Sequence, residues 1–193
     1  DTPDEHMLLA LCRAARAAAP DRPLYLVAEN ERQGGAHVID NAPGGIDAQW
    51  NDDFHHAARV AVTGRSDAYY SDYRGHAHEL LALCRHGFLF QGQRSAWHRA
   101  PRGTPTLRLP PQRFVTYLQN HDQIANAARG LRLHQLADPA GLRAITTFWL
   151  LAPGTPMLFQ GQEFAASSPF LSLNPHHHGT DGFFAAMLVR KAS

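Results

Sequence analysis

Two carboxylates stand where apolar segments of the sequence give way to polar ones. Glu29 directly follows the apolar run at 24–28, and Asp122 follows the run at 113–118 after a short polar stretch. A carboxyl group at such a boundary lies against low-dielectric protein, which raises its pKa and suits a general acid. Two carboxylates at one rim of a sheet are typical of a glycosidase pair, although acidic residues there also occur as surface or capping groups.

The elements that must position these carboxylates are short apolar strands alternating with helices. Strands are predicted at 24–28, 46–50, 113–118 and 156–159. Helices are predicted at 3–19, behind Thr2 as N-cap, and at 53–63, 75–86 and 139–151. The run at 24–28 is uninterrupted, which predicts a parallel strand covered on both faces.

This alternation of strand and helix predicts a parallel α/β protein, either a (β/α)₈ barrel or a doubly wound sheet. No G-x-G-x-x-G follows the first strand and no G-x-x-x-x-G-K-[ST] occurs, so the nucleotide-binding versions of the doubly wound sheet lose support. A whole barrel takes about 250 residues. This chain has 193, including a long stretch at 88–112 without a regular pattern, so a partial barrel is the fold that fits.

Composition and charge argue against several kinds of partner. The chain has 18 Lys and Arg against 17 Asp and Glu, without a run of like charges that would mark a nucleic-acid or membrane surface. Its apolar stretches are far shorter than the roughly 20 residues that span a bilayer. Cys12 and Cys84 match neither a metal site nor a redox pair, which predicts two buried free thiols. We expect a cytoplasmic protein with no nucleic-acid and no membrane partner, although the chain opens at Asp1 without a methionine.

Three segments resemble the α-amylase superfamily in the order of its fifth, sixth and seventh barrel strands. They are YLVAENERQ at 25–33, DAQWNDDFHHAARVAVTG at 47–64 and YLQNHDQIANAARGLRL at 117–133. Within that superfamily, WNDDFHH, DAYYSDY at 67–73 and TPMLFQGQEF at 155–164 are similar to the malto-oligosyltrehalose trehalohydrolase family. The resemblance implies a partial (β/α)₈ TIM barrel, approximately strands five to eight with their helices.

The resemblance also implies roles for individual residues. Glu29 would be the general acid/base that protonates the departing glycosidic oxygen, and Asp122 would stabilise the oxocarbenium-like transition state. His121 would bind the same sugar, while Asn120 or Gln123 would orient the loop. Further substrate contacts are expected on the neighbouring rim, from Asp52, Asp53, His55, His56 and Trp50.

The tryptophans and a run of histidines each have a functional and a purely structural interpretation. The three tryptophans, Trp50, Trp97 and Trp149, could stack on sugar faces, but Trp149 lies in an apolar helix and is expected in the core. Trp50 is the better rim candidate, with core packing as the alternative. The run of three histidines at 176–178 resembles a metal site only weakly, because adjacent side chains diverge, and a solvated loop is favoured.

By the same resemblance, the enzyme's third carboxylate, the nucleophile, would come from a segment before Asp1. We therefore expect residues 1–170 to form the C-terminal half of a glycosidase barrel that requires the N-terminal half, and to be inactive alone. Residues 171–193 diverge from the family and are expected to form a loop plus a short helix; Ala125, where the family pattern has glycine, is a smaller departure.

The implied reaction is retaining hydrolysis of the α-1,4 bond beside the terminal trehalose of maltooligosyl trehalose or a related α-glucan, without cofactor or metal. Two alternatives remain open. A glycogen branching enzyme would share the acid but transfer the chain to another glucan, and WNDDFHH argues against it. A noncatalytic carbohydrate-binding relative would keep the fold without turnover, and the presence of both Glu29 and Asp122 argues against that.

Overall fold

The structure is a computed structural model that describes residues 7–39, 45–125, 130–167, 170–172 and 184–186. Its centre is a four-stranded parallel sheet in the order β1-β2-β5-β6. These strands are β1 (Val27–Ala28), β2 (Ala48–Trp50), β5 (Phe114–Thr116) and β6 (Thr155–Pro156). The register pairs Val27 with Ala48, Gln49 with Phe114 and Val115 with Thr155. The predicted parallel α/β architecture is confirmed, whereas closure into a barrel stays a prediction.

The longer helices agree with the sequence prediction. They are α1 (Met7–Ala18), α3 (Asp52–Thr63), α4 (Ala77–His86) and α6 (Pro139–Leu151). Asp138 caps α6 by accepting hydrogen bonds from the amides of Ala140 (2.9 Å) and Gly141 (3.0 Å), and Asn51 caps α3 by accepting from Phe54 N at 3.1 Å. None of the described helices is long and apolar enough to cross a membrane.

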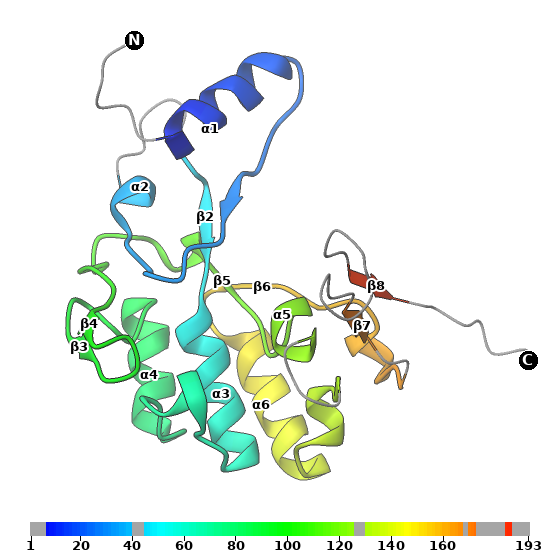
Figure 1. The fold of residues 1–193 in the computed structure, drawn as a ribbon. Helices are drawn as coiled ribbons and strands as arrows, with labels where there is room; N and C mark the ends of the chain where they lie inside the picture. The colour runs from blue at the N-terminus through cyan, green and yellow to red at the C-terminus, as the bar shows by residue number, and fades with distance from the viewer. Residues whose placement is uncertain (1–6, 40–44, 126–129, 168–169, 173–183, 187–193) are drawn as a thin grey trace, which may run out of the picture.

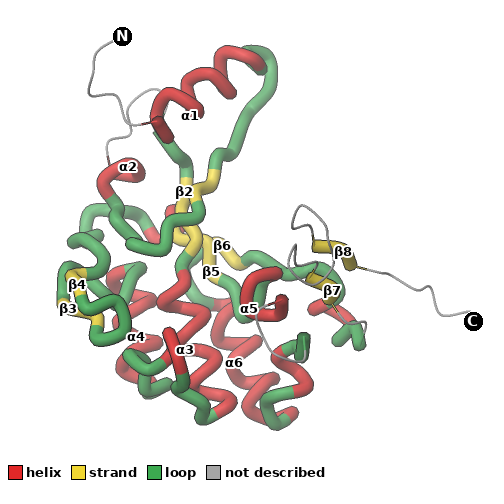
Figure 2. Tube along the Cα trace, in the orientation of Figure 1, coloured by secondary structure: helices red, strands yellow, loops and turns green. Residues whose placement is uncertain are grey.

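The helices lie in two groups around the sheet. Figure 1 shows α3, α4 and α6 side by side below the strands and α1 above them, and Figure 2 shows the strands between the two groups. A core of Phe54, Ala57, Leu118 and Trp149 joins α3 and α6 to β5 and its following loop, with Trp149 0% exposed as expected. A smaller core joins Cys12 of α1 to the sheet region.

The first strand differs from its prediction. β1 has two residues rather than five, and Tyr25 and Val27 are 59% and 39% exposed, so the expected cover on both faces is wrong. The run alternates instead, with Leu24 and Leu26 half-buried and Ala28 buried. The alternation shows that one face of this segment packs into the smaller core, through Leu26 and Ala28, while Tyr25 and Val27 on the other face remain exposed. The cysteines also differ: both are free, but only Cys12 is buried, and Cys84 is half-buried.

The stretch at 88–112, predicted as irregular, contains an antiparallel hairpin. Its strands are β3 (Arg94–Ser95) and β4 (Ala100–Pro101), with Arg94 opposite Pro101 and Ser95 opposite Ala100. Such short strands have no periodic signal, which explains why the pattern did not reveal them. Other short elements without a sequence signal are α2 (Ala36–Ile39), α5 (His121–Ala125) and the 3-10 turns η1 (Ala68–Tyr70), η2 (Pro111–Arg113), η3 (Leu133–Gln135) and η4 (Gln162–Phe164).

The described part of the C-terminal tail is a pair of antiparallel strands. β7 (Phe170–Ser172) pairs antiparallel with β8 (Phe184–Ala186), with Leu171 opposite Ala185. The histidines at 176–178 lie outside the described residues, as does most of the tail for which a short helix is predicted.

Gly87 shows how α4 is ended and fitted to the sheet. Its φ is +79°, and its amide donates to the carbonyl of Leu83 at 2.8 Å, which closes the last turn of the helix. A Cβ at this position would overlap the ring of Phe114 on β5. Glycine is therefore required here both by the backbone conformation and by the close approach of the strand.

Candidate active site

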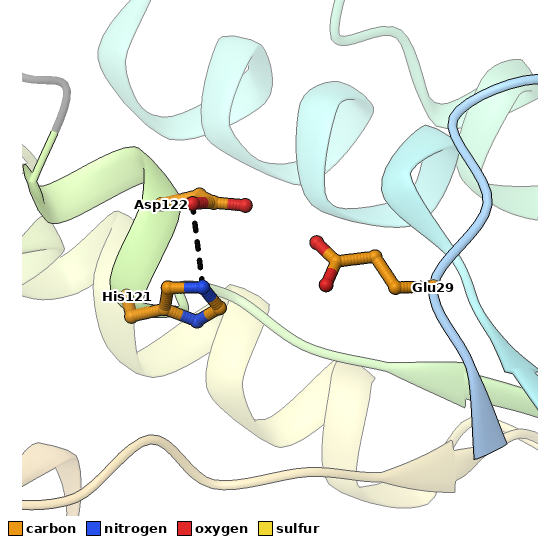
Figure 3. Close-up of side chains that lie close together, drawn as sticks. All are labelled: Glu29, His121 and Asp122. Atoms are coloured by element: carbon orange, nitrogen blue, oxygen red, sulfur yellow. Dashed lines mark ion pairs between the residues drawn. The ribbon is translucent and has the colours of Figure 1, made fainter. Parts of the chain in front are cut away.

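Glu29 and Asp122 lie together although 92 residues separate them in the chain. Glu29 directly follows β1, and Asp122 lies in the first turn of α5, after β5. Figure 3 shows their carboxylates facing each other, with the imidazole of His121 beside them. The ligand atoms of these three residues lie within 4.8 Å of one another. The juxtaposition expected from parallel strands that end at one rim is thus present.

The start of α5 is fixed by a reciprocal pair of hydrogen bonds. Asn120 Oδ1 accepts from the amides of Asp122 (2.9 Å) and Gln123 (3.5 Å), while Gln123 Oε1 accepts from the amide of Asn120 at 3.2 Å. This is the geometry of a capping box, which holds the first turn of a helix in one orientation. Asn120 and Gln123 therefore hold in place the backbone turn that carries Asp122.

His121 and Trp50 form the side of the site next to Asp122. His121 Nε2 lies 3.3 Å from Asp122 Oδ1, an ion pair when the imidazole is protonated. The indole of Trp50 is 6.0 Å from the imidazole of His121, edge to face, and 5.6 Å from the ring of Tyr117. Trp50 is half-buried and packs against these two rings, and it is not among the residues that line the cleft beside Glu29.

The carboxyl group of Glu29 has a strongly shifted pKa. Burial of the carboxyl, a hydrogen bond to Asp122 and the negative charges of Asp122 and Asp52 together raise the pKa of Glu29 from 4.5 to about 7. Desolvation is the largest of these causes, although the residue is solvent-accessible on its cleft side. A carboxyl group with a pKa near 7 can hold a proton at neutral pH and release it, as a general acid/base requires.

Asp52 lies near this pair, at the N-terminus of α3. The hydroxyl of Tyr117 donates a hydrogen bond to Asp52 Oδ1. Burial raises the pKa of Asp52 against the opposing effects of Tyr117 and Arg102. The side chain lines the same cleft as Glu29.

Asp53 and His55, by contrast, are not brought to the cleft. Asp53 is 0% exposed, and its carboxylate accepts from the hydroxyl of Tyr73 (2.6 Å) and from the amides of Leu89 (2.7 Å) and Phe90 (3.0 Å). His55 is 1% exposed, with Nδ1 2.9 Å from the carbonyl of Leu118. These two residues join α3 to its neighbours, so the structure gives both a packing role.

His56 and Arg102 lie deeper in the wall of the cleft. His56 is 6% exposed among the rings of Tyr69, Tyr70 and Tyr73, and burial lowers the pKa of its imidazole well below the usual value, so it is neutral at pH 7. Arg102, which the sequence did not reveal, is 5% exposed, with one guanidinium nitrogen 3.4 Å from Asp53 Oδ1 and another 2.5 Å from His98 Nε2.

A cleft of about 350 Å³ lies beside Glu29 and Asp122, within the range of roughly 300–1,000 Å³ common for small-molecule sites. Its lining is Glu29, Glu31, Asp52, His56, Tyr69, Trp97, His98, Arg102, Asp122 and Gln123. Sequence reasoning missed Glu31, Tyr69, His98 and Arg102 as site residues. The DAYYSDY segment was the available signal for Tyr69, whereas no pattern marked the hairpin that carries His98. Among the described residues, Glu29, His121 and Asp122 are the group close enough to hold a metal ion.

The shifted pKa of Glu29 gives a prediction for a neighbouring residue. Substituting Asp122 with asparagine removes a negative charge from beside Glu29, so the pKa of Glu29 should fall from about 7 toward 4.5. A carbon-detected NMR titration of the Glu29 side-chain carboxyl in the 193-residue chain measures this directly. An unchanged titration midpoint in the Asp122→Asn variant, with the exposed Asp67→Asn as control, would show that the two carboxyls do not interact.

Comparison with known proteins identifies relatives of this chain. The chain is 44% identical over 138 residues to the malto-oligosyltrehalose trehalohydrolase of Deinococcus radiodurans, covering 68% of this chain and 22% of that protein. It is 38% identical over 176 residues to the Mycobacterium tuberculosis protein of the same name, covering 88% of this chain and 30% of that protein. No family model matches the chain.

A solved structure agrees with these relatives. The crystal structure of an alpha-amylase-like protein from Salmonella typhimurium superposes with a TM-score of 0.79 at 36% sequence identity, covering 88% of this chain and 30% of that one. The chain is thus related to the α-amylase family of glycoside hydrolases. More particularly, it is homologous to one part of the malto-oligosyltrehalose trehalohydrolases, and it spans less than a third of the length of those two relatives.

Proposed function

We propose that the chain forms the acid/base-bearing part of a retaining glycoside hydrolase that releases trehalose from maltooligosyl trehalose. The observation that carries the proposal is the meeting of Glu29 and Asp122 in one cleft, with the pKa of Glu29 at about 7. The names of its relatives point to the same reaction. We further propose that residues 1–170 belong to the catalytic barrel, that 171–193 form a separate tail, and that the protein is cytoplasmic.

In this proposal Glu29 transfers protons in both steps of the reaction. Its protonated carboxyl first gives a proton to the glycosidic oxygen as the bond to the trehalose unit breaks. Its carboxylate then takes a proton from the water that attacks the glycosyl intermediate. The carboxyl therefore has to be protonated in one step and ionised in the next, which a pKa near neutrality allows.

Asp122, His121 and Asp52 hold the sugar in this proposal. A carboxylate at the position of Asp122 can accept hydrogen bonds from sugar hydroxyls and favours the positive charge that develops on the ring. His121, 3.3 Å from Asp122, can bind the same ring. Asp52 extends the polar lining along the cleft.

The nucleophile is proposed to lie outside this chain. A retaining pair needs two carboxyls about 5 to 5.5 Å apart, and the spacing of Glu29 and Asp122 alone does not forbid that role for Asp122. The family resemblance assigns Asp122 to transition-state stabilisation instead, so the 193-residue chain by itself is expected to be inactive.

An assay with two substrates tests the proposal. The full-length protein that contains this chain is expected to release trehalose from maltooligosyl trehalose and to form no branch points in amylose. New branch points without trehalose would identify a branching enzyme, and neither product would favour a noncatalytic relative. Trehalose released by the purified 193-residue chain would place the nucleophile within it, and Asp122 would then be the first candidate.

A further inference from the structure

The loop that follows Glu29 is a closed turn at residues 30–33. The amide of Gln33 donates to the carbonyl of Asn30 at 2.9 Å, and Asn30 Oδ1 accepts from the amide of Arg32 at 3.1 Å. Glu29 itself is exposed, and its carboxyl hydrogen-bonds to Asp122 across the cleft. Because an exposed side chain is not held by packing, the position of Glu29 depends on how this turn is fixed.

Gln33 is the most deeply buried residue of this turn. It is 0% exposed, although glutamine is usually a surface residue. Its φ is +54°, in the left-handed region that residues other than glycine rarely adopt. Such a conformation persists only where the surrounding contacts determine it, and it occurs most often at functional sites. The contacts of Gln33 are therefore the place to look for what fixes the turn.

The side-chain amide of Gln33 joins this turn to the first turn of α3. With the amide oriented to form both hydrogen bonds, Oε1 accepts from the amide of Asp52 at 2.8 Å and Nε2 donates to Asp53 Oδ2 at 3.3 Å. The first four amides of a helix have no partner within that helix, so Gln33 provides an acceptor that α3 itself cannot provide. The same contact fixes the distance between the turn after Glu29 and the helix that begins at Asp52.

Two other contacts connect the turn to different neighbours. Gln49 Nε2 on β2 lies 3.5 Å from the carbonyl of Asn30, and the amide of Gly103 donates to the carbonyl of Arg32 at 2.9 Å. The first distance is long for a hydrogen bond, and the second contact joins the turn to the hairpin rather than to the helix. Within the described residues, the link from this turn to α3 is formed by Gln33.

We propose that Gln33 is a positioning residue that sets the place of the Glu29 carboxyl relative to Asp122 and to the glycosidic oxygen. It acts through the turn at 30–33, and its side chain is not among those that line the cleft. This rests on the proposed function, because it takes Glu29 as the acid/base. Proton transfer requires the donor to lie within hydrogen-bond reach of the oxygen, so a small displacement of the turn should slow the reaction far more than it weakens substrate binding.

The test is a double-mutant cycle in the full-length protein that contains this chain, with trehalose release from maltotriosyl trehalose as the assay. Gln33→Met keeps an unbranched side chain of similar length and removes both hydrogen bonds. It should lower kcat roughly 10- to 100-fold and change KM by less than about twofold. In the Glu29→Gln background the same substitution should lower kcat by less than about twofold, because the group that Gln33 positions is already lost. Gln112→Met, the same change at an exposed position in η2, is the matched control with unchanged kcat.

A second variant keeps the test decisive where Gln33→Met does not fold. Gln33→Asn keeps a side-chain amide and suits a positive φ, but it is one methylene shorter and can form only one of the two hydrogen bonds. It should fold like the wild-type protein and lower kcat by about threefold, and this loss should also vanish in the Glu29→Gln background.

The outcomes separate this inference from the function on which it rests. If the wild-type protein releases no trehalose, or if Glu29→Gln keeps the wild-type rate, the proposed function fails and this inference fails with it. If Glu29→Gln loses activity while a folded Gln33→Met keeps kcat within about twofold of the wild-type value, only the role of Gln33 is overturned. Equal losses in both backgrounds would overturn it as well, since a substitution that only destabilises the fold lowers both rates alike.

Discussion

Replacing Glu29 with glutamine in the full-length protein is expected to lower kcat on maltooligosyl trehalose by about 10²- to 10⁴-fold, the usual contribution of a general acid/base. Glutamine keeps the shape of the side chain and its ability to hydrogen-bond, but it cannot give a proton to the glycosidic oxygen. KM should change much less, because the contacts that bind the ground state are retained. Initial rates of trehalose release over a range of substrate concentrations provide both constants.

The control for this substitution is Glu31→Gln, the same change two residues along the chain. Glu31 also lines the cleft, but its side chain is 78% exposed, and its ion-pair contact is His98 at 3.8 Å. A surface contact of this kind contributes little, so kcat should stay within a few-fold of the wild-type value. Equal losses in the two variants, or undiminished turnover in Glu29→Gln, would remove Glu29 from the acid role.

The pH dependence of the full-length enzyme provides an independent check on the same residue. Glu29 must be protonated to act as the acid, and its pKa of about 7 means that this form is lost as the pH rises through neutrality. If glycosidic bond cleavage limits turnover, the alkaline side of the rate profile should reflect this pKa. Because Asp122→Asn is expected to lower the pKa of Glu29, the same substitution links the alkaline side of the profile to Asp122.

The positions of Glu29 and Asp122 were predictable from sequence because a simple rule governs them. Each follows an apolar strand, and parallel neighbouring strands place their carboxyl ends at one edge of the sheet. The helices α3, α4 and α6 were predictable for a similar reason, since Asn51, Gly87 and Asp138 are local start and stop signals. In all of these cases, residues close together in the sequence were sufficient to predict the element and its ends.

The hairpin at 94–101 and the residues it brings to the cleft were not predictable. Its strands have two residues each, and its turn is fixed by Asp72, which lies more than twenty residues earlier in the chain. A contact between segments so far apart cannot be predicted from a local sequence pattern. The burial of the first strand was mispredicted for a related reason, because exposure of Tyr25 and Val27 depends on which elements cover that face of the sheet and not on the run itself.

Asp52 and Asp53 show the same limit at two adjacent positions. The sequence gives no reason to separate two neighbouring aspartates, and both were predicted to contact substrate. Successive side chains in the first turn of a helix point about 100° apart. Asp52 consequently reaches the cleft, while Asp53 turns inward to Tyr73, Leu89 and Phe90. The difference is one of direction around the helix axis.

This inward direction predicts that Asp53 is a major contributor to stability. Asp53→Ala removes the acceptor for one hydroxyl and two backbone amides and leaves the buried Arg102 guanidinium without its carboxylate, which is 3.4 Å away. Breaking a buried ion pair by removing one partner costs about 3–5 kcal/mol. The free energy of unfolding of the 193-residue chain, measured by urea denaturation at pH 7, should fall by that amount.

Two further variants identify the cause of that loss. Asp67→Ala makes the same change at an exposed position whose side chain forms no capping hydrogen bond, and it should cost less than about 0.5 kcal/mol. Adding Arg102→Met to Asp53→Ala removes the unpaired charge and should recover part of the stability, because the remaining cost is then that of the lost hydrogen bonds. A loss below about 1 kcal/mol for Asp53→Ala would mean that Asp53 does not anchor α3 to the hairpin, and its expected contact with substrate would again have to be considered.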